Sequence, residues 1–261
     1  MSRDTLNAKI IRRIDIAPGL IIFRVRPNDG FKTFIPGQYV ALGLPGSSPR
    51  PADYPPEPTP PLPDKLVKRS YSIGSAPGER EFLEFYIAIV PTGALTSRLA
   101  LLAEGSEIWI APKIAGTFTT ADVPPQRNII LVSTGTGIAP YLSMIQSPEI
   151  WTPNRKITVV QGVRYSRDFA YREQLTSLTH SNPALSYHAI VSRKDASWSG
   201  HGGYVQNLFE RGIVAADPSR DHVFLCGNPA MIDDVTKLLS AKGYTEHSRR
   251  SPGNLHLEKY W

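Results

Sequence analysis

The sequence predicts two domains, an antiparallel β-barrel followed by an α/β domain built on a five-stranded parallel sheet. Between Lys9 and Ile114 the chain forms short β-rich runs separated by Gly and Pro, a spacing typical of an antiparallel barrel. From Asn128 onward, compact apolar strands alternate with glycine-bearing loops and helical stretches, as in βα units. A length of 261 residues, 41% of them hydrophobic, is enough for two cores. The Pro124-Pro125 pair marks the boundary, so we expect domains at 1–122 and 128–261.

The first domain is expected to contain six strands and one helix. The strands are predicted at 9–16, 20–26, 38–44, 70–73, 82–90 and 107–110. Leu95, Leu99 and Leu102 recur at helical spacing just after a Pro-Thr-Gly turn. This pattern predicts a single helix that plugs one end of the barrel.

The second domain changes its hydrophobic period. Four of its strands are predicted at 128–132, 156–161, 185–191 and 221–225, and helices at 141–146 and 231–239. The second helix is the clearest, because Met231, Ile232 and Val235 share one face while Asp233 and Asp234 lie near the positive end of its dipole.

A proline-rich insert interrupts the barrel pattern at residues 45–63. It holds nine of the 24 prolines, so it cannot form a central strand. We expect an extended surface loop between two barrel strands, and a Pro-x-x-Pro ligand for a partner domain is the alternative.

Composition excludes several classes of protein. The formal charge of +6 favours acidic partners, but no Lys/Arg run exceeds two residues and no basic stripe with aromatics occurs, so we expect no nucleic-acid binding. A single cysteine excludes an intrachain disulfide and a cysteine-ligated cluster, and the histidines lack metal-binding spacing. No apolar stretch is long enough for a signal peptide or a membrane span. We therefore expect a cytoplasmic protein with no membrane partner and no bound metal.

Arg69-Ser70-Tyr71-Ser72 is the first phrase that suggests chemistry. In a strand, Arg69 and Tyr71 share one face, where the guanidinium can bind a pyrophosphate and the tyrosine ring can pack on a flavin. Ser72 lies on the opposite face unless the strand ends there. Taken alone, the phrase is also compatible with an exposed arginine beside a half-buried strand tyrosine.

Two glycine phrases open helices. Gly93-Ala94-Leu95-Thr96-Ser97 is either an anion site or an ordinary capped turn. Gly135-Thr136-Gly137-Ile138-Ala139-Pro140 follows the first strand of the second domain and resembles a dinucleotide-binding loop, with proline in place of the third glycine.

Three further residues lie at the carboxyl ends of predicted parallel strands, the edge where open α/β sheets bind ligands. Cys226, in Cys226-Gly227-Asn228-Pro229, can border a nicotinamide or simply pack in the core. Arg193 and Arg164 can bind a ribose 2′-phosphate or remain solvated.

Taken in order, and with the terminal Tyr260-Trp261, these phrases resemble the plant-type ferredoxin–NADP(+) reductase superfamily, and most closely its bacterial ferredoxin/flavodoxin–NADP(+) reductases. The resemblance covers nearly the whole chain except the insert. It implies an FAD-binding barrel, an NADP(H)-binding α/β domain, and hydride transfer between NADP(H) and FAD. It also implies one-electron exchange with ferredoxin or flavodoxin by a monomeric enzyme.

The resemblance assigns a role to each phrase. Ser72, Cys226 and Tyr260 would serve catalysis, with Ser72 near the flavin N5 and Tyr260 covering the flavin face. The FAD would be held by Arg69, Tyr71, Ser72, Ala88, Val90, Gly93, Thr96, Ser97, Ala115, Gly116, Thr117 and Trp261. The NADP would be held by Thr134, Gly135, Thr136, Gly137, Arg164, Arg193 and Cys226.

The sequence departs from the family where relatives carry a second arginine after the one at Arg193, because the chain reads Gly202-Gly203-Tyr204 there. The preference for NADPH over NADH therefore stays open. Two alternatives share the fold: a stand-alone NAD(P)H-dependent flavin or ferric-siderophore reductase, and a flavin-bearing regulatory subunit without turnover. The reductase portion of an oxygenase is disfavoured by the single cysteine and the length.

Overall fold

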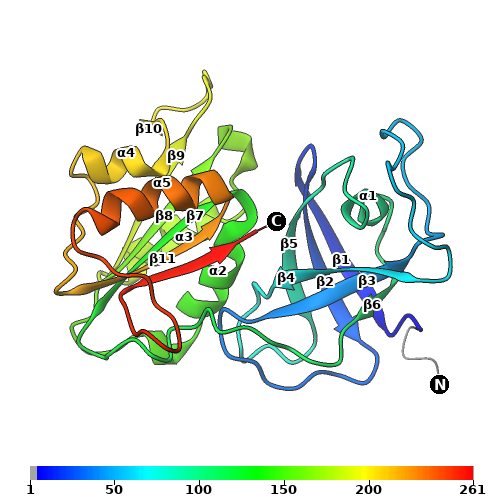
Figure 1. Ribbon diagram of the computed structural model, residues 1–261, viewed down its shortest axis with the longest axis horizontal. Helices are drawn as coiled ribbons and strands as arrows, with labels where there is room; N and C mark the ends of the chain where they lie inside the picture. The colour runs from blue at the N-terminus through cyan, green and yellow to red at the C-terminus, as the bar shows by residue number, and fades with distance from the viewer. Residues whose placement is uncertain (1–4, 261) are drawn as a thin grey trace. The chain divides into compact units, whose positions relative to one another are not determined.

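The computed structural model describes residues 5–260, and the chain divides into two compact units (Figure 1). Unit 1 consists of the chain up to Thr119 together with Leu142–Ser147. Unit 2 consists of Thr120–Tyr141 and the chain from Pro148 onward. Each unit has its own sheet and its own buried core.

Unit 1 is built on a six-stranded antiparallel sheet in the order β4-β3-β6-β1-β2-β5. Its strands are β1 (Ala8–Ala17), β2 (Leu20–Pro27), β3 (Tyr39–Pro45), β4 (Leu66–Ser72), β5 (Leu83–Ala88) and β6 (Glu107–Ile110). The two outer strands meet where the Gly74 amide donates a 2.8 Å hydrogen bond to the Glu84 carbonyl. The sheet is therefore barrel-like, and the sequence-based prediction of an antiparallel barrel is confirmed.

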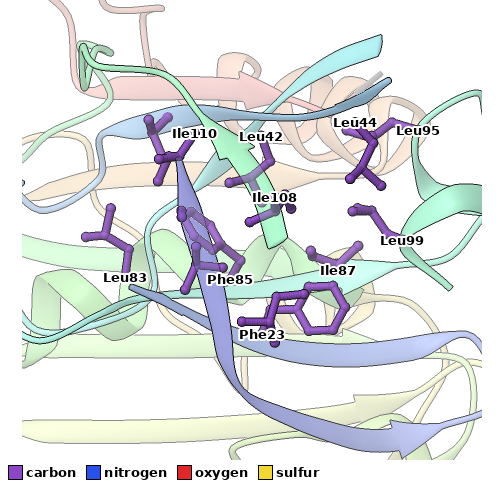
Figure 2. Close-up of a cluster of buried hydrophobic side chains, with 14 of the residues drawn as sticks. Phe23, Leu42, Leu44, Leu83, Phe85, Ile87, Leu95, Leu99, Ile108 and Ile110 are labelled. Carbon is purple, nitrogen blue, oxygen red and sulfur yellow. The ribbon is translucent and has the colours of Figure 1, made fainter. Parts of the chain in front are cut away.

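The core of unit 1 is formed by side chains from every strand (Figure 2). Phe23 and Phe85 are fully buried, and Leu95 and Leu99 enter the same cluster from helix α1 (Thr96–Leu99). The predicted helix therefore reaches the core, but it is a single turn. Beyond it the Leu102 amide bonds the Leu99 carbonyl at 3.1 Å, an i→i+3 contact that tightens the chain out of the α-helix.

Strand β4 begins at Leu66, earlier than the predicted start at Ser70. Its whole length pairs with β3, from Pro45 opposite Leu66 to Tyr39 opposite Ser72. Pairing overrides the weak local signal of the charged stretch Lys68-Arg69. Between the paired ends, residues 46–65 contain neither helix nor strand, which confirms the loop predicted for the insert.

Unit 2 is built on a parallel sheet in the order β10-β9-β8-β7-β11-β12. The strands are β7 (Asn128–Thr134), β8 (Ile157–Val163), β9 (Leu185–Val191), β10 (His201–Gly202), β11 (Asp221–Gly227) and β12 (Leu255–Lys259). The sheet has six strands, so the predicted number of five was wrong. The two edge strands escape sequence analysis because β10 has only two residues and β12 is half polar.

Helices follow the strands of unit 2. The α-helices are α2 (Ala139–Ile145), α3 (Arg172–Ser181), α4 (Val205–Glu210) and α5 (Pro229–Ser240), and the 3₁₀ turns are η1 (Gly135–Ile138), η2 (Pro148–Ile150) and η3 (Ser166–Asp168). Helix α2 starts in unit 2, and its residues from Leu142 onward belong to unit 1. Helices α4 and α5 lie side by side and share an apolar cluster with the sheet. Asn228 caps α5 by accepting a 2.9 Å bond from the Ala230 amide, and the helix begins at Pro229, two residues before the predicted start. Among the described residues, every helix is too short or too polar to cross a bilayer.

Three histidines gather at the amino-terminal edge of this sheet. His256 stacks on Phe224 at 4.1 Å and on His247 at 4.4 Å, and its Nε2 lies 3.0 Å from Nδ1 of His222. Burial lowers the pKa of His256 to about 3 and that of His222 to about 4. Repulsion between charged forms reinforces both shifts: from His247 and His222 on His256, and from Arg127, His247 and Arg155 on His222, against the opposing effect of Asp221. The Asp122 carboxylate lies 3.9 Å from His247. The fold therefore holds His256 and His222 neutral.

This cluster predicts acid sensitivity. Because both pKa values lie below the unfolded value of about 6.5, the unfolded chain takes up protons first as pH falls. The free energy of unfolding should then drop between about pH 6.5 and 4, by about 1.4 kcal/mol per pH unit for each histidine. The free energy of unfolding, measured by urea titration at several pH values in this range, should fall less steeply with decreasing pH in His256→Phe than in wild type. The exposed His180→Gln is the control and should retain the wild-type slope; equal slopes for wild type and His256→Phe would contradict the assignment.

Candidate functional site

Strand β4 carries the first group of predicted site residues. Arg69 is exposed, and its Nη1 donates a 2.7 Å bond to the neighbouring Lys68 carbonyl. Tyr71 packs edge-on against Phe85 at 6.5 Å. Its hydroxyl is buried and bonds to none of the residues that the structure describes. Burial raises the pKa of Tyr71, and the nearby Arg69 opposes this shift. The pair therefore offers an accessible cation beside a phenol whose hydroxyl has no hydrogen-bond acceptor among residues 5–260.

The end of β4 lies beside the predicted Ala115-Gly116-Thr117 stretch. Ser72 is buried and pairs with Tyr39, and Tyr39 also exchanges backbone hydrogen bonds of 2.8 and 2.9 Å with Ala115. Gly116 has a φ of +117°, and a Cβ there would stand 3.1 Å from the Tyr39 ring. The two phrases, distant in sequence, thus meet at one end of the β3–β4 pair.

The third group in unit 1 is the turn from β5 into α1. Ala88 ends β5, and the Gly93 amide closes the turn on the Val90 carbonyl at 2.8 Å. The Thr96 hydroxyl holds the same residue, donating to the Val90 carbonyl at 3.0 Å. Ser97 is completely buried and accepts a 2.9 Å bond from Nε of Arg50 in the insert. This contact between the turn and the insert was not foreseen from the sequence.

In unit 2, the predicted dinucleotide loop follows β7 as a 3₁₀ turn. Gly135 has a φ of +53°, and the space where its Cβ would lie is open, so a ligand can approach the backbone there. At Gly137 the opposite holds, because a Cβ would meet the Cys226 carbonyl and the Cα of Gly227. Thr134 links the turn to β11 by accepting a 2.9 Å bond from the Asn228 amide. Thr136 is buried inside the turn.

Cys226, Glu258 and Tyr260 form a thiol cluster at the end of β11. Cys226 is fully buried, pairs with Glu258 across the β11–β12 ladder, and its Sγ lies 3.9 Å from Oε1 of Glu258. Burial, reinforced by the Glu258 carboxylate, raises the pKa of Cys226, and a hydrogen bond with the Tyr260 side chain partly offsets this. The Tyr260 amide is fixed to the Gly227 carbonyl at 3.1 Å. The cysteine is therefore a neutral thiol at physiological pH.

Sequence analysis missed Glu258. Its signal was slight: a lone acidic residue two positions before Tyr260 in a half-polar stretch. Only the pairing of β12 with β11 shows that it faces the cysteine. Trp261, which the resemblance assigns to FAD binding, lies outside the described residues.

Arg164 and Arg193 follow neighbouring strands, and the structure brings their backbones together through a 3.0 Å bond from the Arg193 amide to the Arg164 carbonyl. Both side chains are exposed. Asp195 ties the two loops, accepting from the Ser166 amide at 2.7 Å and from the Ser197 hydroxyl at 2.6 Å. These bonds, the one from the Ser197 side chain first, lower the pKa of Asp195. The arrangement presents two cations from a braced pair of loops.

Comparison with known proteins shows which proteins share the fold of this chain. Residues 131–237 match the family described as the oxidoreductase NAD-binding domain, which covers most of unit 2. A crystallised ferredoxin NADP+ reductase from Neisseria gonorrhoeae, with bound FAD and NADP, has the same fold with a TM-score of 0.80 at 24% identity, covering 97% of each chain. The chain therefore shares the two-domain fold of that structure.

The family follows from closer relatives. A flavodoxin/ferredoxin–NADP reductase of Buchnera aphidicola subsp. Baizongia pistaciae is 32% identical over 92% of this chain and 93% of its own. A ferredoxin–NADP reductase of Pseudomonas aeruginosa is also 32% identical, over 92% of this chain and 91% of its own. The chain belongs to the flavodoxin/ferredoxin–NADP reductase family and is an oxidoreductase, as its motifs predicted.

The close contact at Gly137 can be tested by substitution. In Gly137→Ala the added methyl group has to displace backbone atoms of β11 rather than a flexible side chain. We expect a loss of about 1–3 kcal/mol in the free energy of unfolding, measured by urea titration. Gly202→Ala is the matched control in the same unit, because no atom of the described part of the chain lies within 4 Å of its Cβ position. A Gly137→Ala protein as stable as the control would show that the turn is not held against β11.

Proposed function

We propose that the protein is an FAD-dependent reductase that uses NADP(H) and exchanges electrons with ferredoxin or flavodoxin. The observation that carries the proposal is the composition of the two units: unit 1 holds Arg69, Tyr71 and the α1 turn, and unit 2 holds the glycine turn, the paired arginines and the thiol cluster. These are the sites that a flavin nucleotide and a pyridine nucleotide require. The relatives named above are similar to this protein over 92% of its chain.

The residues of unit 1 fit FAD. The orphaned Tyr71 hydroxyl gains an acceptor if a ligand rich in hydroxyl groups, such as a ribityl chain, lies against it. Arg69, on the same face of β4, matches a pyrophosphate. Gly116 keeps the space beside Tyr39 narrow and free of side chain, which suits a flat ring. Bound FAD supplies the redox chemistry, accepting a hydride and releasing electrons singly.

The residues of unit 2 fit NADP(H). Gly135 leaves the backbone of the turn open for a pyrophosphate, and Arg164 and Arg193 supply cations for a 2′-phosphate. Cys226 places a small, neutral, polarizable group at the end of β11, against which a nicotinamide ring can pack. The Glu258 carboxyl beside it stabilises positive charge on the oxidised ring. Because Tyr260 bonds to Cys226, its ring has to move before a nicotinamide can reach the thiol.

The net charge of the protein and the names of its relatives suggest the class of its electron acceptor. A formal charge of +6 favours a small acidic electron carrier, and long-range attraction speeds its encounter with the enzyme. Ferredoxins and flavodoxins are the carriers that the names of the relatives specify.

The acceptor assay tests this proposal. With NADPH as donor, we expect reduction of flavodoxin or ferredoxin at a kcat/KM that falls as salt rises, because screening weakens attraction between exposed charges. Free FMN and a ferric siderophore are the comparison acceptors. Efficient turnover with those alone, insensitive to salt, would instead favour a stand-alone flavin or siderophore reductase.

The arginine pair predicts the nucleotide preference. Arg193→Gln removes a charge-assisted contact to the 2′-phosphate. Such a contact contributes about 1.5–3 kcal/mol to binding, so the KM for NADPH should rise roughly ten- to hundredfold. The KM for NADH, which lacks this phosphate, should stay unchanged. Arg220→Gln, an exposed arginine paired with Asp217 at the opposite edge of the sheet, is the control and should alter neither value. Equal effects on both nucleotides would refute the assignment.

A further inference from the structure

The proline-rich segment 46–65 is tied to helix α1 by an ionic network. The segment lies beside α1 in Figure 1, where it is the light-blue to cyan loop. Arg98 of α1 is only 3% exposed, and Glu57 and Arg50 of the segment have side chains 9% and 16% exposed. Enclosed charges are unusual in a surface loop and need specific partners.

Glu57 is the carboxylate partner of Arg98. Arg98 donates from Nη1 to Oε1 at 2.7 Å and from Nη2 to Oε2 at 2.9 Å, a two-pronged contact. Its Nη2 also bonds the Gly46 carbonyl at the base of the segment. Hydrogen bonds from Arg98 lower the pKa of Glu57. The pair therefore joins the middle and the base of the segment to α1.

Arg50 makes the second attachment. Its Nε donates to the Ser97 hydroxyl at 2.9 Å, its Nη2 donates to the Pro91 carbonyl at 3.0 Å, and its Nη1 lies 4.0 Å from Glu57. Pro91 and Ser97 bracket the turn that enters α1. The segment is thus fixed against the α1 turn, which the proposed function includes in the FAD site.

Strand β4 indicates which part of a bound FAD would lie near segment 46–65. Its first residue, Leu66, pairs with Pro45 at the base of the segment, while its last, Ser72, pairs with Tyr39. At about 3.3 Å per residue, the two ends are roughly 20 Å apart. With a flavin ring at Tyr71 and Ser72 and a pyrophosphate at Arg69, which lies between them and Leu66, the phosphate and adenosine half of FAD extends towards the segment.

We propose that segment 46–65 is a latch, closed by the Arg50–Glu57–Arg98 network, that retains FAD by covering its phosphate and adenosine half. This rests on the proposed function, because it takes residues 88–97 as part of the FAD site. While the latch is closed, the Glu57 carboxylate pairs with the guanidinium of Arg98. If Glu57 is neutralised, a buried guanidinium loses that partner, and the segment opens to let water reach it. The prolines limit the conformations of the open segment and so favour closure.

The test is the rate of FAD release from the purified holoprotein, followed by the rise in flavin fluorescence after dilution. Glu57→Gln keeps the size of the side chain and removes the charge, and it should release FAD about ten- to hundredfold faster. A second variant replaces residues 49–61 by a four-residue Gly-Ser linker, so that Arg98 becomes solvated, and should release FAD at least as fast. Glu81→Gln, in an exposed pair with Arg26, is the matched control and should match wild type.

Hydrogen exchange of residues 46–65 in FAD-free protein gives an independent measure of opening. It should be faster in Glu57→Gln than in wild type and in Glu81→Gln. Wild-type exchange in Glu57→Gln would overturn the latch, and so would faster exchange with an unchanged rate of FAD release. A wild-type protein that takes up no FAD at all would instead overturn the proposed function, and the latch with it.

Discussion

Parallel pairing in unit 2 is the constraint on which its chemistry depends. Because β7, β8, β9 and β11 run in one direction, the loops that follow them emerge at the same edge of the sheet. That edge collects the glycine turn after β7, the arginines after β8 and β9, and the thiol at the end of β11. Strand β12 extends the same pattern, and its register delivers Glu258 to Cys226 and Tyr260 to the end of β11.

Unit 1 depends on a different constraint, the long antiparallel ladder of β3 and β4. One end of the ladder holds Tyr71, Ser72 and the stretch beginning at Ala115, and the other end is the base of the proline-rich segment. An extended ligand along this strand therefore meets different chemistry at each end: an aromatic ring with a buried hydroxyl at one, and arginines beside a helix turn at the other. Val67 and Tyr71 of β4 pack against the hydrophobic core of the unit.

Local patterns explain what could be predicted from the sequence. Glycine and proline turns, period-two strands and the apolar face of α5 are short-range features, so both units and most of their strands were predicted. The motifs at Arg69 and Gly135 were equally local. Other features depend on pairing across long separations: Glu258 lies 32 residues from Cys226, and Glu57 lies 41 from Arg98. The sequence carries no nearby signal for either pair, nor for the stacking of His222, His247 and His256.

The central claim is that one chain holds a flavin that a pyridine nucleotide can reduce. Anaerobic titration of the purified, FAD-loaded protein with NADPH, followed through the visible flavin absorption band, tests it most directly. The account predicts that the band bleaches with one NADPH consumed per flavin, because one hydride carries both electrons. A protein that binds FAD but keeps its oxidised spectrum in excess NADPH would contradict the account.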